Sequence, residues 1–201
     1  MAQAINSCMF WKKYKNKLIY IVIFLAAFLF RLISVFNYTA PLGGDEVSYN
    51  TLAHSIVEDG KYSNPNESHS RPPVYPFFIS IFYFIFGYKL IAVRIAQAVL
   101  DSFLCVLIYK LCCGLFNRSV ALIASFSSVI YLLFISGVSR FLTEALFTFL
   151  LFLVVFYVYK TKEKLTYINM CILGVAIALL ALTKAITILF LPFLFLVLII
   201  A

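Results

Sequence analysis

Charged residues are scarce in this sequence, and acidic residues are the scarcest of all. Only 12% of the 201 residues are charged and 64% are hydrophobic, whereas a soluble domain is nearer one quarter charged and one half apolar. Five of the eight acidic residues fall in one short stretch of the chain: Asp45, Glu46, Glu58, Asp59 and Glu67. This composition excludes a soluble globular domain and indicates a polytopic membrane protein.

Metal-ligand patterns are also missing. The five cysteines show no metal-ligand spacing, and the two histidines, His54 and His69, lie in a polar loop without such spacing. Four of the cysteines lie in or beside apolar runs or on the predicted cytoplasmic side, so buried or free thiols are expected rather than disulfides. The net charge of +8 does not indicate nucleic-acid binding, because the cations stand at the ends of apolar runs, where membrane topology rules place them.

Long apolar runs are what the sequence has in abundance. They predict six membrane spans, at residues 18–36, 91–112, 119–138, 145–159, 167–182 and 186–201. A signal peptide is the competing interpretation of the first run, but the run is longer than a signal core and lacks a convincing small-residue cleavage site. Basic residues before the first span predict a cytoplasmic N-terminus and an outer loop at 37–90. The expected protein is a multi-pass protein of the plasma membrane.

The outer loop is predicted to carry two interfacial helices. Gly43-Gly44 break the chain, and apolar residues then recur with helical spacing from Asp45 to Asp59. Residues 77–86 are intensely apolar but shorter than the ~20 residues that a span needs, so they are expected to stay on the outer side. The predicted fold class is therefore an all-α membrane helical bundle, with one transmembrane domain over residues 1–201 and interfacial helices in its extracytoplasmic first loop.

Two ionisable residues lie inside predicted spans. Arg31 is near the outer end of the first span and is expected to snorkel to the interface. Asp101 lies in the middle of the second span, where an acid is a functional candidate by default. A bond to Ser102 or to a neighbouring helix is an equally open interpretation of Asp101.

The predicted topology brings charges from four separate segments to the same outer face: Asp45, Glu46, Arg71, Arg140, Glu144 and Lys184. Charges buried in a membrane bundle are costly and usually functional, and charges gathered at one interface from separate segments indicate a single site. Each has a simpler interpretation alone: Arg140 and Lys184 as headgroup anchors, and Glu144 as the acid that starts the next helix. Their joint clustering is what favours a single site.

Several short motifs carry a resemblance to a known family. They are Asp45-Glu46, Arg71-Pro72-Pro73-Val74-Tyr75-Pro76, Arg94-Ile95-Ala96-Gln97-Ala98, Leu142-Thr143-Glu144-Ala145 and Leu182-Thr183-Lys184. In order and spacing the chain resembles the polyprenyl-phosphate-sugar-dependent glycosyltransferases of the GT-C fold, in the subgroup related to protein O-mannosyltransferases and the aminoarabinose transferase of lipid A. Family members usually run to more than twice this length, so the chain is expected to be the N-terminal portion of a longer protein.

The resemblance implies roles for individual residues. The acid of the first outer loop, here Asp45, is the proposed catalytic base, Glu144 assists the site, and Lys184 lies near the lipid phosphate. A guanidinium such as that of Arg71 matches the geometry of phosphate oxygens. The predicted catalytic residues are Asp45, Glu46 and Glu144, and the predicted substrate- and phosphate-binding residues are Arg71, Tyr75, Arg140 and Lys184. No cofactor is predicted, and a divalent metal held by Asp45 and Glu46 stays open.

The predicted function is transfer of a sugar from a polyprenyl-phosphate donor to a lipid, glycan or protein acceptor at the outer face. An acceptor hydroxyl needs a base within hydrogen-bond reach, and a departing phosphate needs cations around it. A fragment of a transporter or flippase is one alternative, but it predicts ionisable groups at the midplane, where only Asp101 lies. A non-catalytic membrane subunit is the other.

Overall fold

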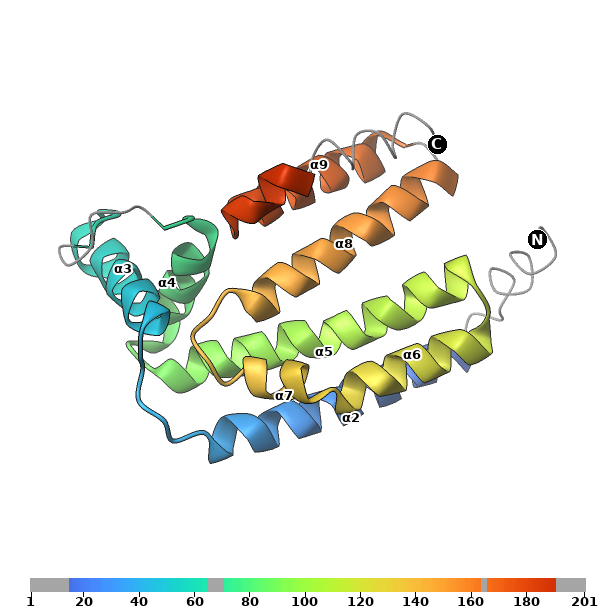
Figure 1. The fold of residues 1–201 in the computed structure, drawn as a ribbon, viewed down its shortest axis with the longest axis horizontal. Helices are drawn as coiled ribbons and strands as arrows, with labels where there is room; N and C mark the ends of the chain where they lie inside the picture. Colours follow the sequence, from blue (N-terminus) through green and yellow to red (C-terminus); the bar gives the residue numbers. More distant parts are fainter. Residues whose placement is uncertain (1–14, 65–70, 164–165, 191–201) are drawn as a thin grey trace. The chain divides into compact units, whose positions relative to one another are not determined.

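All the regular elements that the structure describes are helices. The structure, a computed structural model, describes residues 15–64, 71–163 and 166–190. Its elements are α2 (Lys15–Asn37), α3 (Asp45–Asp59), α4 (Val74–Phe86), α5 (Leu90–Leu115), α6 (Arg118–Ile130), α7 (Leu132–Gly137), α8 (Glu144–Glu163), α9 (Tyr167–Ala181) and the 3-10 helix η1 (Ala185–Phe190) (Figure 1). The predicted fold class, an all-α membrane helical bundle, is confirmed.

Within the described residues, three helical segments are long and apolar enough to cross a membrane: Lys17–Asn37, Leu90–Leu115 and Glu144–Thr161. They correspond to the predicted spans 18–36, 91–112 and 145–159. The predicted span 119–138 comprises two helices, α6 and α7, and 167–182 corresponds to the shorter α9. Of the predicted span 186–201, the last eleven residues lie outside the described ranges. That these three segments also cross the membrane stays a prediction.

Local sequence sets both ends of α3, whose bounds are those predicted. Gly44 precedes the helix with φ 54°, and Gly60 follows it in the left-handed conformation with φ 64°. A side chain is strained at such angles, so glycine is the residue that suits both positions. The next helix, α4, begins directly after Pro72-Pro73, because proline fixes φ and lacks the N–H that a first helical turn leaves unused.

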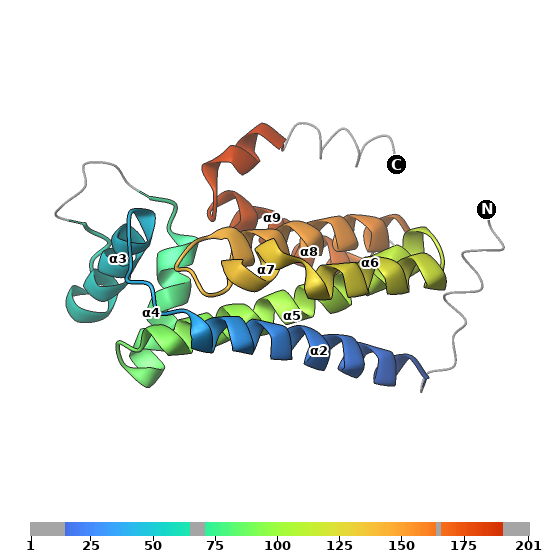
Figure 2. The same cartoon turned by 60° about the horizontal axis from the view of Figure 1, so that its bottom comes forward.

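The chain divides into two compact units, and each has its own packing. The first unit comprises residues 1–41 and 94–140, in which α2 packs against α6 and α7 (Figure 1). Its buried core contains Ile23, Ala27, Cys105, Tyr109, Ala121 and Val129. The second unit comprises residues 42–93 and 141–201, in which α3 packs on α4 and α8 packs on α9 (Figure 2). The first four residues of α5 belong to this second unit.

The prediction that Arg31 snorkels is wrong. Its side chain is fully buried inside the first unit and forms an ion pair with Asp101 of α5. A buried partner and nearby backbone carbonyls replace the water that a snorkelling side chain reaches for. The open question about Asp101 is settled in favour of a bond to a neighbouring helix, while the Ser102 hydroxyl donates to the Ala98 carbonyl instead.

The thiols agree with the prediction made from the sequence. Cys105, Cys112, Cys113 and Cys171 are all free, and Cys105 is fully buried. Cys8 lies outside the described residues.

Candidate functional site

Asp45 stands at the first position of α3, on the outer side of the turn made by Gly43-Gly44. The helix start is closed by backbone bonds, in which the Glu46 and Val47 N–H groups donate to the carbonyls of Gly43 and Gly44 at 3.1 and 3.2 Å. The Asp45 side chain is 58% exposed and accepts a hydrogen bond from Arg71 Nη2 at 2.9 Å. Its carboxylate is thus held at a helix end and remains exposed to solvent.

Glu46, the adjacent carboxylate, lies in different surroundings. It is buried, and its Oε2 accepts a hydrogen bond from the Gly43 N–H at 3.2 Å. This bond closes the turn just before the helix, in the manner of a capping box. The structure therefore gives Glu46 a role in closing the turn, and its predicted catalytic role remains a prediction.

Arg71 is positioned by two tyrosines. Its backbone carbonyl accepts from the Tyr62 hydroxyl at 2.6 Å, and its guanidinium lies 5.6 Å from the ring centroid of Tyr49. Burial raises the pKa of the Tyr49 phenol, and the nearby Arg71 guanidinium opposes this rise. The sequence analysis missed Tyr49. The available signal was its position one turn after Asp45, which places both residues on the same face of α3.

Tyr75, at the start of α4, is completely buried. Its ring meets that of Tyr49 edge to face, with centroids 5.0 Å apart. Burial, and after it the Glu144 carboxylate, holds the pKa of the Tyr75 phenol well above its ordinary value, so the hydroxyl keeps its proton. Tyr75 presents no exposed surface in this structure. It packs against Tyr49, and its predicted part in substrate binding stays a prediction.

Glu144 and Lys184 form another ion pair of the second unit. Lys184 Nζ lies 2.8 Å from Glu144 Oε1, and it also lies 5.4 Å from the ring centroid of Phe147, one turn along α8. Lys184 follows the end of α9, and its N–H donates to the Leu180 carbonyl at 3.3 Å. Glu144 is also the acid in the first turn of α8, so its simpler interpretation holds alongside the pairing.

The two ion pairs belong to one patch of the second unit. The Val74 N–H donates to the Leu182 carbonyl at 3.2 Å, which joins the start of α4 to the turn that carries Lys184. The Glu144 carboxylate raises the pKa of both the Tyr49 and the Tyr75 phenol. The pKa of Tyr49 is also raised by Asp45 and lowered by Arg71. Residues from α3, the segment before α4, α8 and the turn after α9 therefore lie together in the second unit. We call Asp45, Arg71, Glu144 and Lys184 the charged patch.

Arg140 is the predicted site residue that belongs to the first unit, whereas the other six belong to the second. It is the last residue of the first unit, with an exposed side chain and a backbone carbonyl that accepts from Gln97 Nε2 at 2.8 Å. Its part in substrate binding stays a prediction.

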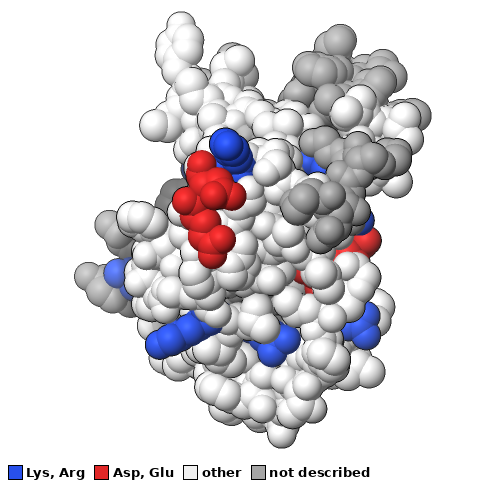
Figure 3. All heavy atoms as spheres, turned by 90° about the vertical axis from the view of Figure 1, so that its left-hand side faces the viewer, with Lys and Arg blue, Asp and Glu red and all other residues white. Residues whose placement is uncertain are grey.

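On the face of the molecule that carries α3, charged side chains are few, and acidic side chains lie against basic ones (Figure 3).

The open possibility of a divalent metal gains no support from the side chains around Asp45. In the ranges that the structure describes, no three His, Cys, Asp or Glu side chains form a group that could hold a metal ion. Asp45 faces Arg71, while Glu46 faces the Gly43 amide.

Comparison with known proteins gives one match. The family model described as dolichyl-phosphate-mannose-protein mannosyltransferase matches residues 70–201, which is most of the chain. The matched region contains Arg71, Tyr75, Glu144 and Lys184, whereas Asp45 and Glu46 precede it. Searches of curated proteins and of solved structures gave no match.

Proposed function

Since the chain belongs to the family of dolichyl-phosphate-mannose-protein mannosyltransferases, which are membrane glycosyltransferases, we propose that it transfers a sugar from a polyprenyl-phosphate donor at the outer face of the membrane. The acceptor is a hydroxyl on a lipid, a glycan or a protein. The observation that carries the proposal is the charged patch, where two acids and two cations from four segments meet beside apolar helices.

The donor fits this arrangement because its two ends have different chemistry. The isoprenoid tail partitions into the bilayer, and the phosphate and sugar then stand at the interface. In the proposed reaction Asp45 takes the proton of the acceptor hydroxyl, and the hydroxyl oxygen attacks the anomeric carbon of the sugar. The bond from that carbon to the phosphate oxygen breaks, and polyprenyl phosphate leaves with the electron pair. Arg71 and Lys184 stabilise its growing negative charge.

Both cations are already paired with carboxylates in the structure, which implies an exchange of partners. The pairs are partly exposed, and such pairs contribute only about 0–1 kcal/mol. A phosphate oxygen forms strong charge-assisted hydrogen bonds with a guanidinium or an ammonium group. Donor phosphate therefore displaces Asp45 from Arg71 and Glu144 from Lys184. The same step frees the Asp45 carboxylate to act as a base, so the donor binds before the acceptor.

A transfer assay tests the proposed function. Membranes containing the chain in its full natural length are given polyprenyl-phosphate mannose with a radiolabelled sugar, and label is measured in protein, glycan and lipid fractions. We expect label to leave the donor and appear in one acceptor fraction. Movement of intact donor across the membrane without transfer would instead support a transporter or flippase. If neither transfer nor movement of the donor occurred, the result would support a non-catalytic subunit.

The proposed orientation, with a cytoplasmic N-terminus and residues 37–90 wholly outside, has its own test. Ser63, in the outer loop, and Ser119, at the start of α6, are both exposed. Each is replaced by cysteine in a cysteine-free chain and treated with a membrane-impermeant thiol reagent. We expect labelling at position 63 from outside and at position 119 from inside only. Labelling at position 119 from outside would mean that α4 spans the membrane, and the orientation of the following helices would reverse.

A further inference from the structure

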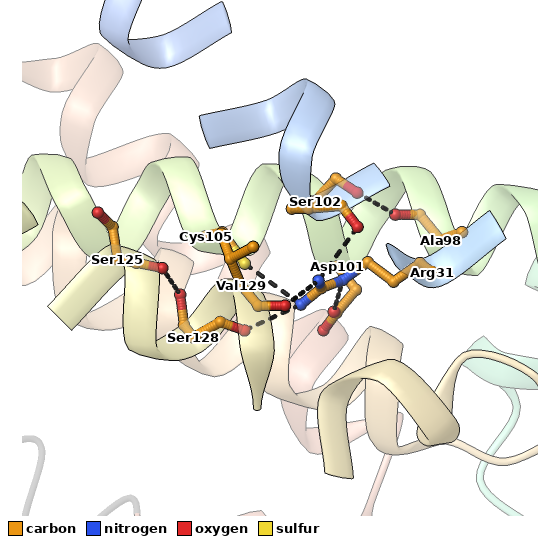
Figure 4. Close-up of polar contacts among 9 residues, drawn as sticks. Arg31, Ala98, Asp101, Ser102, Cys105, Ser125, Ser128 and Val129 are labelled. Atoms are coloured by element: carbon orange, nitrogen blue, oxygen red, sulfur yellow. Dashed lines mark hydrogen bonds and ion pairs between the residues drawn. The ribbon is translucent and has the colours of Figure 1, made fainter. Parts of the chain in front are cut away.

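Arg31 makes more polar contacts than an ion pair requires. Besides Asp101, its guanidinium donates to the carbonyls of Val129 at 2.9 Å and Ser128 at 3.1 Å, and to the Ala27 carbonyl of its own helix at 3.2 Å (Figure 4). The remaining contact is with Cys105 Sγ at 3.3 Å. The Arg31 and Asp101 side chains are 0% and 2% exposed. These contacts connect α2 to the end of α6.

The carbonyls that Arg31 contacts stand where the helix breaks. α6 ends at Ile130, Tyr131 is extended with ψ 114°, and α7 begins at Leu132. The last carbonyls of a helix have no partner within it, and the bilayer interior offers no water to satisfy them. Ser128 and Val129 belong to this last turn of α6. In an unbroken helix these carbonyls would accept from N–H groups of the next turn. At the break, the guanidinium of Arg31 donates to them instead.

The sequence at the break contains neither of the residues that most often break a helix, proline and glycine. Helix breaks usually arise at proline, at glycine, or where a side chain inserts into the backbone hydrogen-bond ladder. Residues 118–136 contain neither proline nor glycine. Within α6, the Ser128 and Ser125 hydroxyls bond back to the Ser125 and Leu122 carbonyls. Arg31 is a side chain from another helix that reaches the carbonyls at the break itself.

We propose that Arg31 is an intramembrane helix cap that creates the break between α6 and α7, with Asp101 as the counter-charge that lets it stay buried. A planar guanidinium suits this role because it offers five N–H donors in fixed directions. Here they reach the carboxylate of α5 and two carbonyls of α6 together. The proposal does not depend on the reaction that the protein catalyses.

Other side chains of α2 and α5 hold the chain beyond the break. Ser34, one turn after Arg31 on α2, shares a hydrogen bond of 2.9 Å with the Ser139 hydroxyl. Gln97 Nε2 donates to the carbonyls of Val138 and Arg140 at 2.9 and 2.8 Å. α2 and α5 thus hold α6, the break and the turn that follows α7 in one arrangement of the first unit.

Three variants separate a helix cap from a simple ion pair. Arg31→Asp with Asp101→Arg keeps the opposite charges but moves the guanidinium from α2 to α5. Arg31→Met with Asp101→Leu removes both charges and leaves an apolar interior. Arg31→Lys keeps the positive charge but loses the planar guanidinium and its fixed N–H donors. The full chain is reconstituted in lipid nanodiscs, and the midpoint of thermal unfolding is measured for each, with Lys89→Met, at an exposed position before α5, as the control.

A cap predicts that none of the three variants regains the native midpoint. Recovery in the charge-swapped or the apolar double variant would show that only the charges matter and would overturn the proposal. The helix break is read directly by nitroxide labels at Val120 and Ser136, which flank it on exposed positions. In the apolar double variant we expect the separation to move to the ~24 Å of an unbroken helix. An unchanged separation in that variant would equally contradict the proposal.

Discussion

The two units contain ion pairs of similar residues in opposite surroundings. In the first unit the Arg31 and Asp101 side chains are 0% and 2% exposed, whereas in the second unit Asp45 and Glu144 remain 58% and 53% exposed beside Arg71 and Lys184. A buried pair that loses one partner leaves an uncompensated charge, while a partly exposed pair exchanges its partner for water or a ligand. Burial thus distinguishes a pair that maintains the fold from pairs that are available for chemistry.

This difference also bears on the transporter alternative. That hypothesis predicts ionisable groups at the membrane midplane, where the sequence analysis placed only Asp101. Asp101 is almost completely buried and is engaged with Arg31, so it does not stand open to a passing substrate. The carboxylates of the charged patch, in contrast, remain more than half exposed.

The largest expected effect is the loss of transfer in Asp45→Asn. The amide keeps the size of the side chain but cannot take a proton, so the rate should fall by roughly 10²–10⁴-fold, as is typical for loss of a general base. The measurement is sugar transfer from polyprenyl-phosphate mannose by the full-length chain in membranes.

Glu46→Gln is the matched control for that variant, because its amide oxygen can still accept from the Gly43 N–H. We expect it to lose less than about tenfold in rate, since its bond holds the turn rather than the acceptor. If Glu46→Gln lost transfer while Asp45→Asn kept it, the base would be Glu46. Near-normal rates in both would end the catalytic interpretation of this loop.

The next effect compares the same substitution in the two units. Arg31→Gln leaves Asp101 buried without its charge partner and should lower the free energy of unfolding by about 3–5 kcal/mol. Arg71→Gln, at a partly exposed pair, should lower it by no more than about 1 kcal/mol. Denaturant unfolding in detergent micelles measures both. Equal losses would mean that the pairs do not differ in the way their burial indicates.

Local signals in the sequence were enough to predict much of this structure. Gly43-Gly44 and Asp59-Gly60 gave both ends of α3, because glycine geometry depends only on neighbouring residues. Basic flanks and apolar runs placed Asp45, Arg71, Glu144 and Lys184 at one face, and the structure brings these four together in the second unit.

Contacts between distant segments were beyond such signals. The prediction that Arg31 snorkels was made from one helix alone, whereas the partner of Arg31 lies 70 residues away on α5. The break at Tyr131 went unpredicted because no proline or glycine marks it. The sequence likewise did not show which acid pairs with which cation, since a shared face does not fix distances.

A smaller effect is expected from loss of the two patch cations. Arg71→Gln and Lys184→Gln each remove a hydrogen bond between charged groups, which contributes about 1.5–3 kcal/mol, so the affinity for the lipid donor should fall by roughly 10- to 150-fold. The dissociation constant for polyprenyl phosphate, measured with the purified chain in nanodiscs, is the readout. Unchanged affinity in both variants would leave Arg71 and Lys184 as interface anchors, their simpler interpretation.

The smallest effect has the opposite sign and tests the partner exchange itself. Asp45 and Glu144 compete with the donor phosphate for Arg71 and Lys184. When one carboxylate is removed, the phosphate binds the corresponding cation without first breaking its ion pair. Since partly exposed pairs contribute up to about 1 kcal/mol, Asp45→Asn and Glu144→Gln should each bind polyprenyl phosphate up to about fivefold more tightly, although Asp45→Asn no longer transfers sugar. Asp59→Asn, at the exposed far end of α3, should leave the affinity unchanged. Weaker binding in Asp45→Asn would mean that its carboxylate orients Arg71 for the phosphate rather than competing with it, and the donor would then bind without freeing the base.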